Sequence, residues 1–392
     1  MRSGLFFKIA IVVALFTGSL AACAQESATE PIPDSNPDTQ RHIHYVANEM
    51  YVPIMNAMPR GLDVLEVYAD LPGKHPLALL THGTSVDKQE RMRVTPWAQY
   101  NQALWFARRG FVVLVVVRKG YGRSSGVQDN QSGGCNSHGS FKEAGEASAD
   151  ELGQVVHWAA SRAEIDVSTI VSAGVSTGGF AQVALSADPP KGLKAAISFA
   201  GGRGSDGKEH NCNLDGLLRA FQSYGKDAAK HGSLPMLWIY SENDHYFPAA
   251  MATRFDEAYR KGGGADEFVM NPPNGDDGHH LYSHLDAWSN TVGAFLKAHG
   301  LLPLGEELLP LPTVPDEPAP AGLHDHGLEV WKRFLAGAPF KAFATNGDGI
   351  WGLSAGAFDQ AIADQLAVDR CKKAAGANAS RCQVAARTPG VK

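Results

Sequence analysis

A serine, an acid and a histidine in a suitable order give this chain its candidate chemistry, and Ser176 is the residue from which the others follow. Thr169–Ala173 is rich in β-branched and small residues and predicts a buried strand, whereas Phe180–Leu185 predicts a helix. Between them stands Gly174–Gly178, which reads Gly-Val-Ser-Thr-Gly. This context is typical of a nucleophile elbow, a sharp turn that exposes the serine hydroxyl, and its glycines leave room where strand and helix meet. Ser176 is therefore the predicted nucleophile, beside a helix N-terminus that favours negative charge.

The same Gly-x-Ser-x-Gly pattern occurs twice more, in settings that favour plain turns. Gly122–Gly126, around Ser124, follows a strand-like run but leads into a polar, glycine-rich loop. Gly352–Gly356, around Ser354, has no hydrophobic strand before it. Because the pattern has catalytic meaning only between a strand and a helix, we predict that both copies are turns.

A serine hydroxyl is a poor nucleophile at its ordinary pKa, so Ser176 needs a general base and an acid that orients this base. In the order expected for such an elbow, the acid follows the serine and the histidine comes last. Asp244 comes shortly after the predicted strand Met236–Tyr240, which places it at the same edge of the sheet as Ser176. Glu242 is the competing acid, and the structural alternative is that Asp244 only caps a turn.

The candidate base lies after the last predicted strand, Glu267–Met270. His279 directly follows Gly278, an arrangement found in the catalytic loop of proteins with such an elbow. His280 and His284 are the alternatives, because either side chain could reach the same edge. A lone histidine is more often a surface or core residue than a base, so the position in the chain is what favours His279.

An attacked carbonyl also needs two donors for its developing oxyanion. One should be the backbone N–H of Thr177, next to the nucleophile. The other should come from the loop after the strand Leu77–Leu80, where His82–Thr84 resembles the His-Gly motif of esterases. We assign this second donor to the backbone N–H of Thr84; the alternative is that the loop is only a tight turn.

Predicted strands and helices, which would position these residues, alternate along the chain. Continuous apolar runs joined by helical patterns predict an α/β fold, a mostly parallel sheet with helices on both faces. Leu62–Tyr68 alternates like an exposed strand. Further strands are predicted at Leu77–Leu80, Phe111–Val117 and Ala195–Ala200, and helices at Pro96–Arg109, Ala144–Arg162 and Leu285–His299.

The N-terminal residues predict a targeting segment. Arg2 and Lys8 give it positive charge, and the apolar run Ile9–Phe16 is too short to span a membrane. We therefore expect a signal peptide at residues 1–22, cleaved before Cys23. The alternative is ordinary cleavage at this point, with the cysteine incidental.

Leu20–Cys23 reads Leu-Ala-Ala-Cys and resembles a bacterial lipobox. The resemblance implies lipidation of Cys23 and a membrane contact through this N-terminal lipid anchor. Because Ala24 is not aspartate, it also implies the outer membrane, on the periplasmic side of the cell envelope. Residues 23–43 are rich in Ser, Pro, Asp and Glu and predict a disordered tether.

The rest of the chain divides by composition into a large domain at residues 44–302, a proline-rich linker at 303–326 and a small module at 327–392. The net charge of −6 argues against a nucleic-acid partner. No histidine pair has the spacing and carboxylate company of a zinc site, and no dinucleotide fingerprint is present. We therefore expect neither a metal nor a cofactor.

Taken together, these motifs resemble those of the α/β-hydrolase superfamily, in its dienelactone hydrolase and prolyl-oligopeptidase-like branch. The resemblance covers about Val46 to Gly300 and rests on the elbow, His82–Thr84, Arg118–Gly126, the Asp244 loop and Gly278–His279. Dienelactone hydrolases have a cysteine nucleophile where this chain has Ser176, which points to ordinary ester chemistry.

The resulting expectation is an exported serine hydrolase that cleaves a small-molecule carboxylic ester through an acyl-enzyme. Ser176, Asp244 and His279 would form the triad, and the N–H groups of Thr84 and Thr177 would hold the oxyanion. One alternative is a serine exopeptidase or amidase with the same triad. Another is a catalytically silent binding protein on the same fold.

Four cysteines remain after Cys23, and an even number in an exported protein predicts disulfides. Three pairings are possible. Cys135 and Cys212 both lie in loops that leave the predicted active-site edge of the sheet, and Cys371 and Cys382 are close in sequence. We therefore predict Cys135–Cys212 and Cys371–Cys382.

Overall fold

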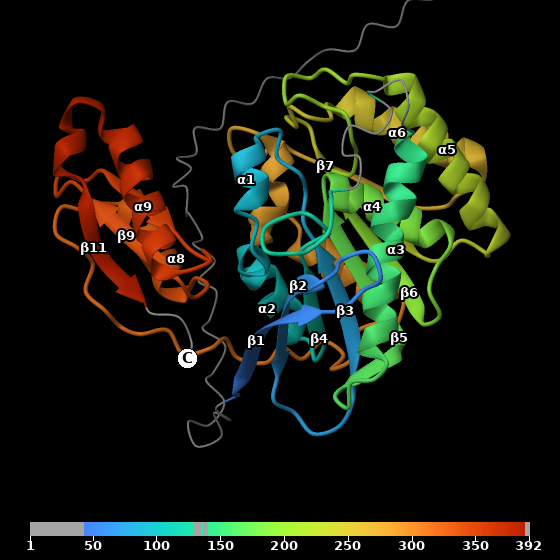
Figure 1. Cartoon of the computed structure of the whole chain (residues 1–392), viewed down its shortest axis with the longest axis horizontal. Helices are drawn as coiled ribbons and strands as arrows, with labels where there is room; N and C mark the ends of the chain where they lie inside the picture. Colours follow the sequence, from blue (N-terminus) through green and yellow to red (C-terminus); the bar gives the residue numbers. More distant parts are fainter. Residues whose placement is uncertain (1–42, 129–134, 136–139, 389–392) are drawn as a thin grey trace, which may run out of the picture. The chain divides into compact units, whose positions relative to one another are not determined.

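The computed structural model describes residues 43–128, 135 and 140–388 (Figure 1). Its main feature is a sheet of eight strands in the order β1-β2-β4-β3-β5-β6-β7-β8. β1 and β2 pair antiparallel and β2 pairs antiparallel with β4, whereas every later pair is parallel. The strands are β1 (Tyr45–Val52), β2 (Leu62–Ala69), β3 (His75–Thr81), β4 (Val112–Val116), β5 (Ile165–Val175), β6 (Leu193–Phe199), β7 (Met236–Ser241) and β8 (Glu267–Asn271).

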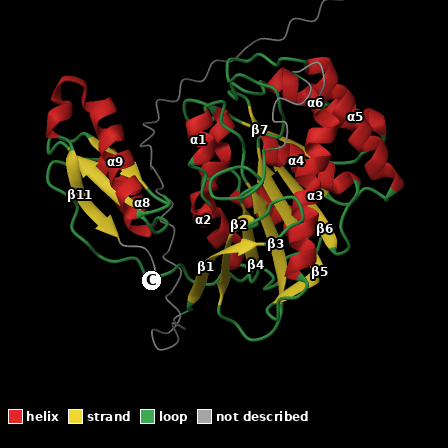
Figure 2. Ribbon diagram, viewed as in Figure 1, coloured by secondary structure: helices red, strands yellow, loops and turns green. Residues whose placement is uncertain are grey.

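Both faces of this sheet are buried, as an α/β fold requires. Alternate residues of β3 enter two different hydrophobic clusters: Ala78 and Leu80 belong to one, Leu77 and Leu79 to the other. Side chains of α2 (Tyr100–Ala107) and α7 (Ser289–Ala298) join the first cluster, and side chains of α3 (Phe141–Ala159) join the second. The predicted fold class, a mostly parallel sheet covered by helices on both faces, is confirmed (Figure 2).

The remaining helices of this region follow the strands that carry the candidate site. They are α1 (Lys88–Met92), η2 (Pro96–Gln99), α4 (Thr177–Ala187), α5 (Leu214–Lys230), α6 (Ala249–Gly262), η3 (Gly278–Ser283) and η4 (Leu285–Ala287). Among them α4 matters most, because it begins directly after Ser176 and its residues are buried throughout.

One element differs from its prediction. The strand predicted at Leu62–Tyr68 was expected to expose one face, but β2 is buried almost throughout, and its charged residues Asp63 and Glu66 are fully inaccessible. The reason is that both faces of β2 are covered, since Leu65 and Val67 pack in one hydrophobic cluster and Leu62 and Val64 in the other. The helix predicted at Pro96–Arg109 also divides, into η2 and α2.

The C-terminal part of the chain has a small antiparallel sheet of its own, in the order β10-β9-β11. Ala342 and Ala344 of β9 pack in one cluster with residues of α9, and Phe343 packs in another with residues of α8. The elements are α8 (His326–Ala336), β9 (Lys341–Thr345), β10 (Trp351–Ser354), α9 (Gln360–Ala375), η5 (Gly376–Arg381) and β11 (Gln383–Thr388). The predicted small module at the C-terminus is thus present, and the predicted disulfide Cys371–Cys382 lies within it.

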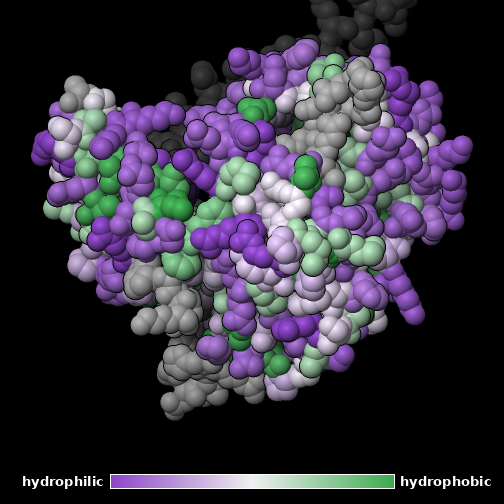
Figure 3. Space-filling model, viewed as in Figure 1, coloured by the Kyte–Doolittle hydropathy of each residue, from purple (hydrophilic) through white to green (hydrophobic). Residues whose placement is uncertain are grey.

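Hydrophilic side chains cover much of the described surface on the face drawn in Figure 3. No helix in the described ranges is both long and apolar enough to cross a membrane. The signal peptide and the lipidation of Cys23 predicted from the sequence lie outside the described residues.

Candidate active site

Ser176 stands where β5 ends and α4 begins, on a turn with an unusual backbone. Its φ is 56° and its ψ is −120°, in the region of positive φ that few residues other than glycine adopt. A Cβ added at Gly174 would lie 2.4 Å from the carbonyl oxygen of Gly178, and one added at Gly178 would lie 2.5 Å from that of His82. Glycine is therefore required on both sides of Ser176, as a nucleophile elbow demands.

Asp244 and His279 lie together at the same edge of the sheet, after β7 and β8 respectively. The Nδ1 atom of His279 is 3.0 Å from Oδ2 of Asp244 and 3.1 Å from Oδ1. Asp244 is buried, and its Oδ1 also accepts the backbone N–H groups of Tyr246 and Phe247, each at 2.8 Å. These bonds fix the carboxylate and leave Nε2 of His279 as the ring atom able to take a proton.

Two aromatic rings hold the His279 imidazole in place. Tyr246 stacks on it with 4.2 Å between ring centroids, and Phe247 meets it edge-on at 5.5 Å. The backbone N–H of His279 donates to Oδ1 of Asp277 at 2.9 Å. Because the ring is packed on one side and bonded on the other, its free edge has a defined direction.

Ser176 and His279 line one cavity of about 240 Å³. Tyr246, His280 and Gly83 also line it. Within the described part of the chain no hydrogen bond uses the Ser176 hydroxyl, and none joins it to His279. Catalytic hydrogen bonds are often long before substrate binds, so a serine and a base that line one cavity without this bond are compatible with catalysis.

Thr84 and Thr177 face each other beside the nucleophile. Their hydroxyl oxygens are 2.8 Å apart, and Thr84 Oγ1 also contacts the Tyr121 hydroxyl. A Cβ on Gly83 would lie 2.9 Å from the Cβ of Ser176, so the loop after β3 passes directly over the serine. In the described ranges no hydrogen bond uses the backbone N–H of Thr84 or Thr177. Both predicted oxyanion donors are thus near Ser176 and available.

His82 supports this loop from below as a neutral side chain. Its Nδ1 bonds to the carbonyl oxygen of Gly83, and its Nε2 accepts the backbone N–H of Arg118 at 3.0 Å. Burial, together with the positive charge of Arg118, holds the pKa of His82 well below its usual range. The neutral ring can therefore donate at one nitrogen and accept at the other.

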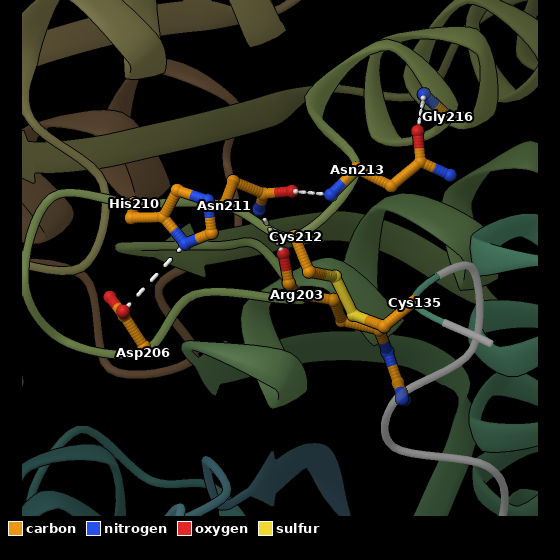
Figure 4. Close-up of a disulfide and its surroundings, with 8 residues drawn as sticks. All are labelled: Cys135, Arg203, Asp206, His210, Asn211, Cys212, Asn213 and Gly216. Atoms are coloured by element: carbon orange, nitrogen blue, oxygen red, sulfur yellow. Dashed lines mark hydrogen bonds and ion pairs between the residues drawn. A yellow bond between two sulfur atoms is a disulfide. The ribbon is translucent and has the colours of Figure 1, made fainter.

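A second cavity, of about 580 Å³, also opens on Ser176 and Thr177. The predicted disulfide Cys135–Cys212 is present and forms part of its wall (Figure 4). Arg203 also lines this cavity; its side chain donates to Ser148 Oγ at 2.8 Å, and its carbonyl accepts the Asn211 side chain at 2.6 Å. The disulfide thus belongs to the surroundings of the candidate site.

Among the alternatives weighed from the sequence, His280 lines the same cavity as His279, but no hydrogen bond in the described chain joins it to Asp244. Glu242, His280 and His284 are exposed, and His284 bonds to Asn274. Ser124 is buried in the turn after β4, where its hydroxyl is fully bonded. Ser354 ends β10, so a strand does precede it, contrary to expectation, but it is buried and no helix follows at once.

Sequence reasoning did not single out Arg118, Tyr121, Tyr246 or Arg203 as site residues. Each lies within a few residues of the carboxyl end of a parallel strand, and that edge is where open α/β sheets bind ligands. Position after a strand was therefore the available signal. No group of three or more metal-ligating side chains that could hold an ion occurs among the residues described.

A model of the family "X-Pro dipeptidyl-peptidase (S15 family)" matches residues 63–235, fewer than half of the 392 residues. Among curated proteins none matches the sequence. A solved structure assigned as a dienelactone hydrolase from Klebsiella pneumoniae subsp. pneumoniae is similar at 16% identity, over 65% of this chain and 99% of its own, with a TM-score of 0.43.

Two archaeal structures are similar at the same level. An esterase of Pyrococcus furiosus is 15% identical over 65% of this chain and 93% of its own, with a TM-score of 0.43. An acylaminoacyl peptidase of Pyrococcus horikoshii is 13% identical over 72% of this chain and 44% of its own, with a TM-score of 0.47.

The match to a peptidase family covers the elbow and the loop after β3, and it agrees with what the sheet already shows. The strand order, the antiparallel pairing of the first strands and the turn from β5 through Ser176 into α4 are all features of the α/β-hydrolase fold. We conclude that this chain has the α/β-hydrolase fold.

Proposed function

We propose that this protein is a serine hydrolase that cleaves carboxylic esters through an acyl-enzyme. The observation that carries the proposal is the buried Asp244–His279 pair, whose imidazole lines the same cavity as Ser176. A nucleophile, a base and an orienting acid in this arrangement are the parts that acyl transfer needs.

In the acylation step, Ser176 Oγ attacks the ester carbonyl carbon while its proton passes to Nε2 of His279. The carbonyl oxygen becomes an oxyanion, held by the backbone N–H groups of Thr84 and Thr177. When the tetrahedral intermediate collapses, the bond to the alcohol oxygen breaks, and the His279 proton passes to this leaving group. Asp244 stabilises the imidazolium throughout.

Deacylation repeats these steps with water as the nucleophile. His279 takes one proton from the water as its oxygen bonds to the acyl carbon. The second tetrahedral intermediate then releases Ser176 Oγ, which recovers its proton from His279. The products are a carboxylic acid and an alcohol, and the enzyme returns to its starting state.

A second candidate function is a serine peptidase or amidase that uses the same triad. The match of residues 63–235 to a family of X-Pro dipeptidyl-peptidases favours it. The two functions differ in the leaving group, since an amine needs a proton from His279 at an earlier stage than an alkoxide does.

A substrate panel separates these candidates. We expect hydrolysis of short p-nitrophenyl esters at a kcat/KM at least about 100-fold above that for X-Pro and aminoacyl p-nitroanilides of similar size, a gap of about 3 kcal/mol. Ser176→Ala is the matched control and should be inactive on every substrate. Preference for the anilides would make the protein a peptidase, and inactivity of a folded wild-type protein on all of them would favour a binding role.

We further propose that the enzyme is exported and anchored by lipid on Cys23. The support is the Leu-Ala-Ala-Cys sequence together with two disulfides, which persist in oxidising compartments. Expressed in a bacterium with lipoprotein machinery, the wild-type protein should partition into membranes, and Cys23→Ser should be released. A wild-type protein recovered entirely in the soluble fraction, with an unmodified Cys23, would count against the anchor.

A further inference from the structure

Arg118 is a buried cation next to the candidate oxyanion hole. It follows β4 and is only 2% exposed. One guanidinium nitrogen, Nη2, donates to Thr177 Oγ1 at 2.8 Å and reaches Thr84 Oγ1 at 3.4 Å. The other, Nη1, donates to the carbonyl oxygen of His82 at 2.7 Å. A single side chain thus contacts both threonines and the start of the loop that holds one of them.

Among the residues that the structure describes, Arg118 makes these contacts without a counter-ion. In the ranges that the structure describes, no carboxylate forms an ion pair with Arg118, whereas its neighbour Lys119 pairs with Glu151 at 3.9 Å. His82, a titratable group in contact with Arg118, stays neutral because burial, together with the charge of Arg118, depresses its pKa. Burying a charge without an opposite charge is costly, so such a residue calls for a functional explanation.

We propose that Arg118 is a positioning residue of the oxyanion hole, whose buried charge is compensated only when the oxyanion forms. Through the two hydroxyl groups it sets the distance between the Thr84 loop and the first turn of α4. The backbone N–H groups of Thr84 and Thr177 are thereby held in place before substrate arrives. The inference rests on the proposed function, because it assigns a role in acyl transfer at the same site.

Two parts of the geometry favour this role over a purely structural one. The Arg118 backbone N–H donates to His82 Nε2, so both ends of Arg118 hold the same loop. The Tyr121 ring lies 5.4 Å from the Arg118 guanidinium carbon, and its hydroxyl contacts Thr84 Oγ1, which closes the other side. In these surroundings, screened from water, a positive charge stabilises a nearby anion more strongly than it would at the surface.

The test compares Arg118→Gln with Arg118→Lys on a p-nitrophenyl ester. We expect Arg118→Gln to lower kcat by about 10- to 100-fold with KM changed by less than about 3-fold, since the ground-state carbonyl carries little charge. Arg118→Lys should recover part of the loss, because it keeps the charge but not the planar fork. Binding of a trifluoromethyl ketone, which forms a tetrahedral adduct with an oxyanion, should weaken in proportion to kcat/KM.

Arg109→Met is the matched control for loss of a partly buried arginine. Arg109 lies over the Trp105 ring at 3.4 Å and takes no part in the candidate site. Its variant should lose thermal stability but keep kcat and ketone affinity within about 2-fold. A parallel fall of kcat in Arg109→Met and Arg118→Gln would make the effect a general loss of packing and overturn the proposal.

Thr177→Val keeps the test decisive even when Arg118→Gln fails to fold, since it removes the hydroxyl that Arg118 contacts and leaves the arginine in place. It should lower kcat by about 3- to 30-fold, and combined with Arg118→Lys the losses should be less than additive. Additive losses would overturn this inference and leave the proposed function intact. Unchanged kcat in both Thr177→Val and Arg118→Lys, measured beside an active wild-type protein, would do the same. An inactive wild-type protein would instead reject the proposed function.

Discussion

Ser176 and Ser124 stand in the same sequence pattern, and the two regions around them use a serine in different ways. The Ser124 hydroxyl donates to the carbonyl of Val117 at 2.7 Å and accepts the backbone N–H of Asp63 at 2.8 Å. The hydroxyl of Ser176 has no such partner in the described chain, and its backbone has positive φ. A serine whose hydrogen-bonding capacity is used by the protein holds a turn, whereas one without protein partners can react.

Backbone context produces this difference. After β5 a helix begins at once, and close contacts at Gly174 and Gly178 force the sharp turn that presents Ser176. After β4 the chain instead folds back over β2, so Ser124 meets backbone groups that need partners. The predictions below test how completely the two roles are separated.

The largest expected effect is the loss of the nucleophile. Ser176→Ala should lower kcat by about 10⁶-fold and abolish covalent labelling by a fluorophosphonate, as for loss of a triad serine. Mass spectrometry of the labelled wild-type protein should place the adduct on Ser176. An adduct on Ser124 or Ser354 that persists in Ser176→Ala would reverse the comparison.

Loss of the base should come next. His279→Ala should lower kcat by at least about 10⁴-fold, because no other group described near Ser176 is held by a buried carboxylate. Its exposed neighbour provides the matched control, since His280→Ala should change kcat by less than about 5-fold. Equal losses in the two variants would show that Asp244 does not select the base.

Asp63 of β2, whose backbone N–H donates to Ser124, should make the stability of the protein depend on pH. Burial, and then the nearby charge of Glu49, raises the pKa of Asp63 to about 7, with smaller opposing effects from Arg123 and Arg60. The unfolded chain titrates near 3.8, so between these values the folded protein binds the extra proton. The free energy of unfolding should therefore fall as pH rises from about 4 to 7, by at most about 1.4 kcal/mol per pH unit for this group.

Asp63→Asn checks this assignment by urea denaturation at pH 4 and pH 8. The variant should match the wild type within about 1 kcal/mol at pH 4 and be more stable at pH 8, because it has no carboxylate to ionise. Any hydrolase activity should not change, because Asp63 lies outside the candidate active site. Identical pH slopes for the two proteins would show that other buried acids account for the dependence.

The smallest effect is expected for Ser124 itself. Ser124→Ala leaves the buried N–H of Asp63 without its partner, which costs about 1–3 kcal/mol of stability. The kcat should stay within about 3-fold of the wild-type value. A loss of activity much greater than the loss of stability would mean that the two serines are not independent.

The sequence allowed much of this site to be anticipated. Ser176, Asp244 and His279 could be predicted because residues of such a site lie at the carboxyl ends of strands. Each of them therefore follows a recognisable strand in the sequence. The structure brings the predicted residues together, with His279 bonded to Asp244 and lining one cavity with Ser176. The disulfide Cys135–Cys212 was predictable on the same ground, because both cysteines follow strands that end at one edge.

Other features depend on contacts between residues far apart in the chain, which no local sequence pattern reveals. The alternation of β2 suggested an exposed face, but both faces of the strand pack in hydrophobic clusters and bury its charged residues. In the sequence, Arg118 was one residue of the Arg118–Gly126 motif, with no role of its own. Its guanidinium contacts Thr84, in the loop after β3, and Thr177, the first residue of α4, which lie 34 and 59 positions away in the chain.

The positive φ of Ser176 has a consequence for directed evolution. Glycine adopts such a backbone without steric cost, whereas a residue with a Cβ pays about 1–3 kcal/mol for it. Replacing Ser176 by glycine should thus give an inactive protein that melts at a higher temperature than the native one. A library sorted only for heat resistance would discard the nucleophile, so any such selection must also demand turnover.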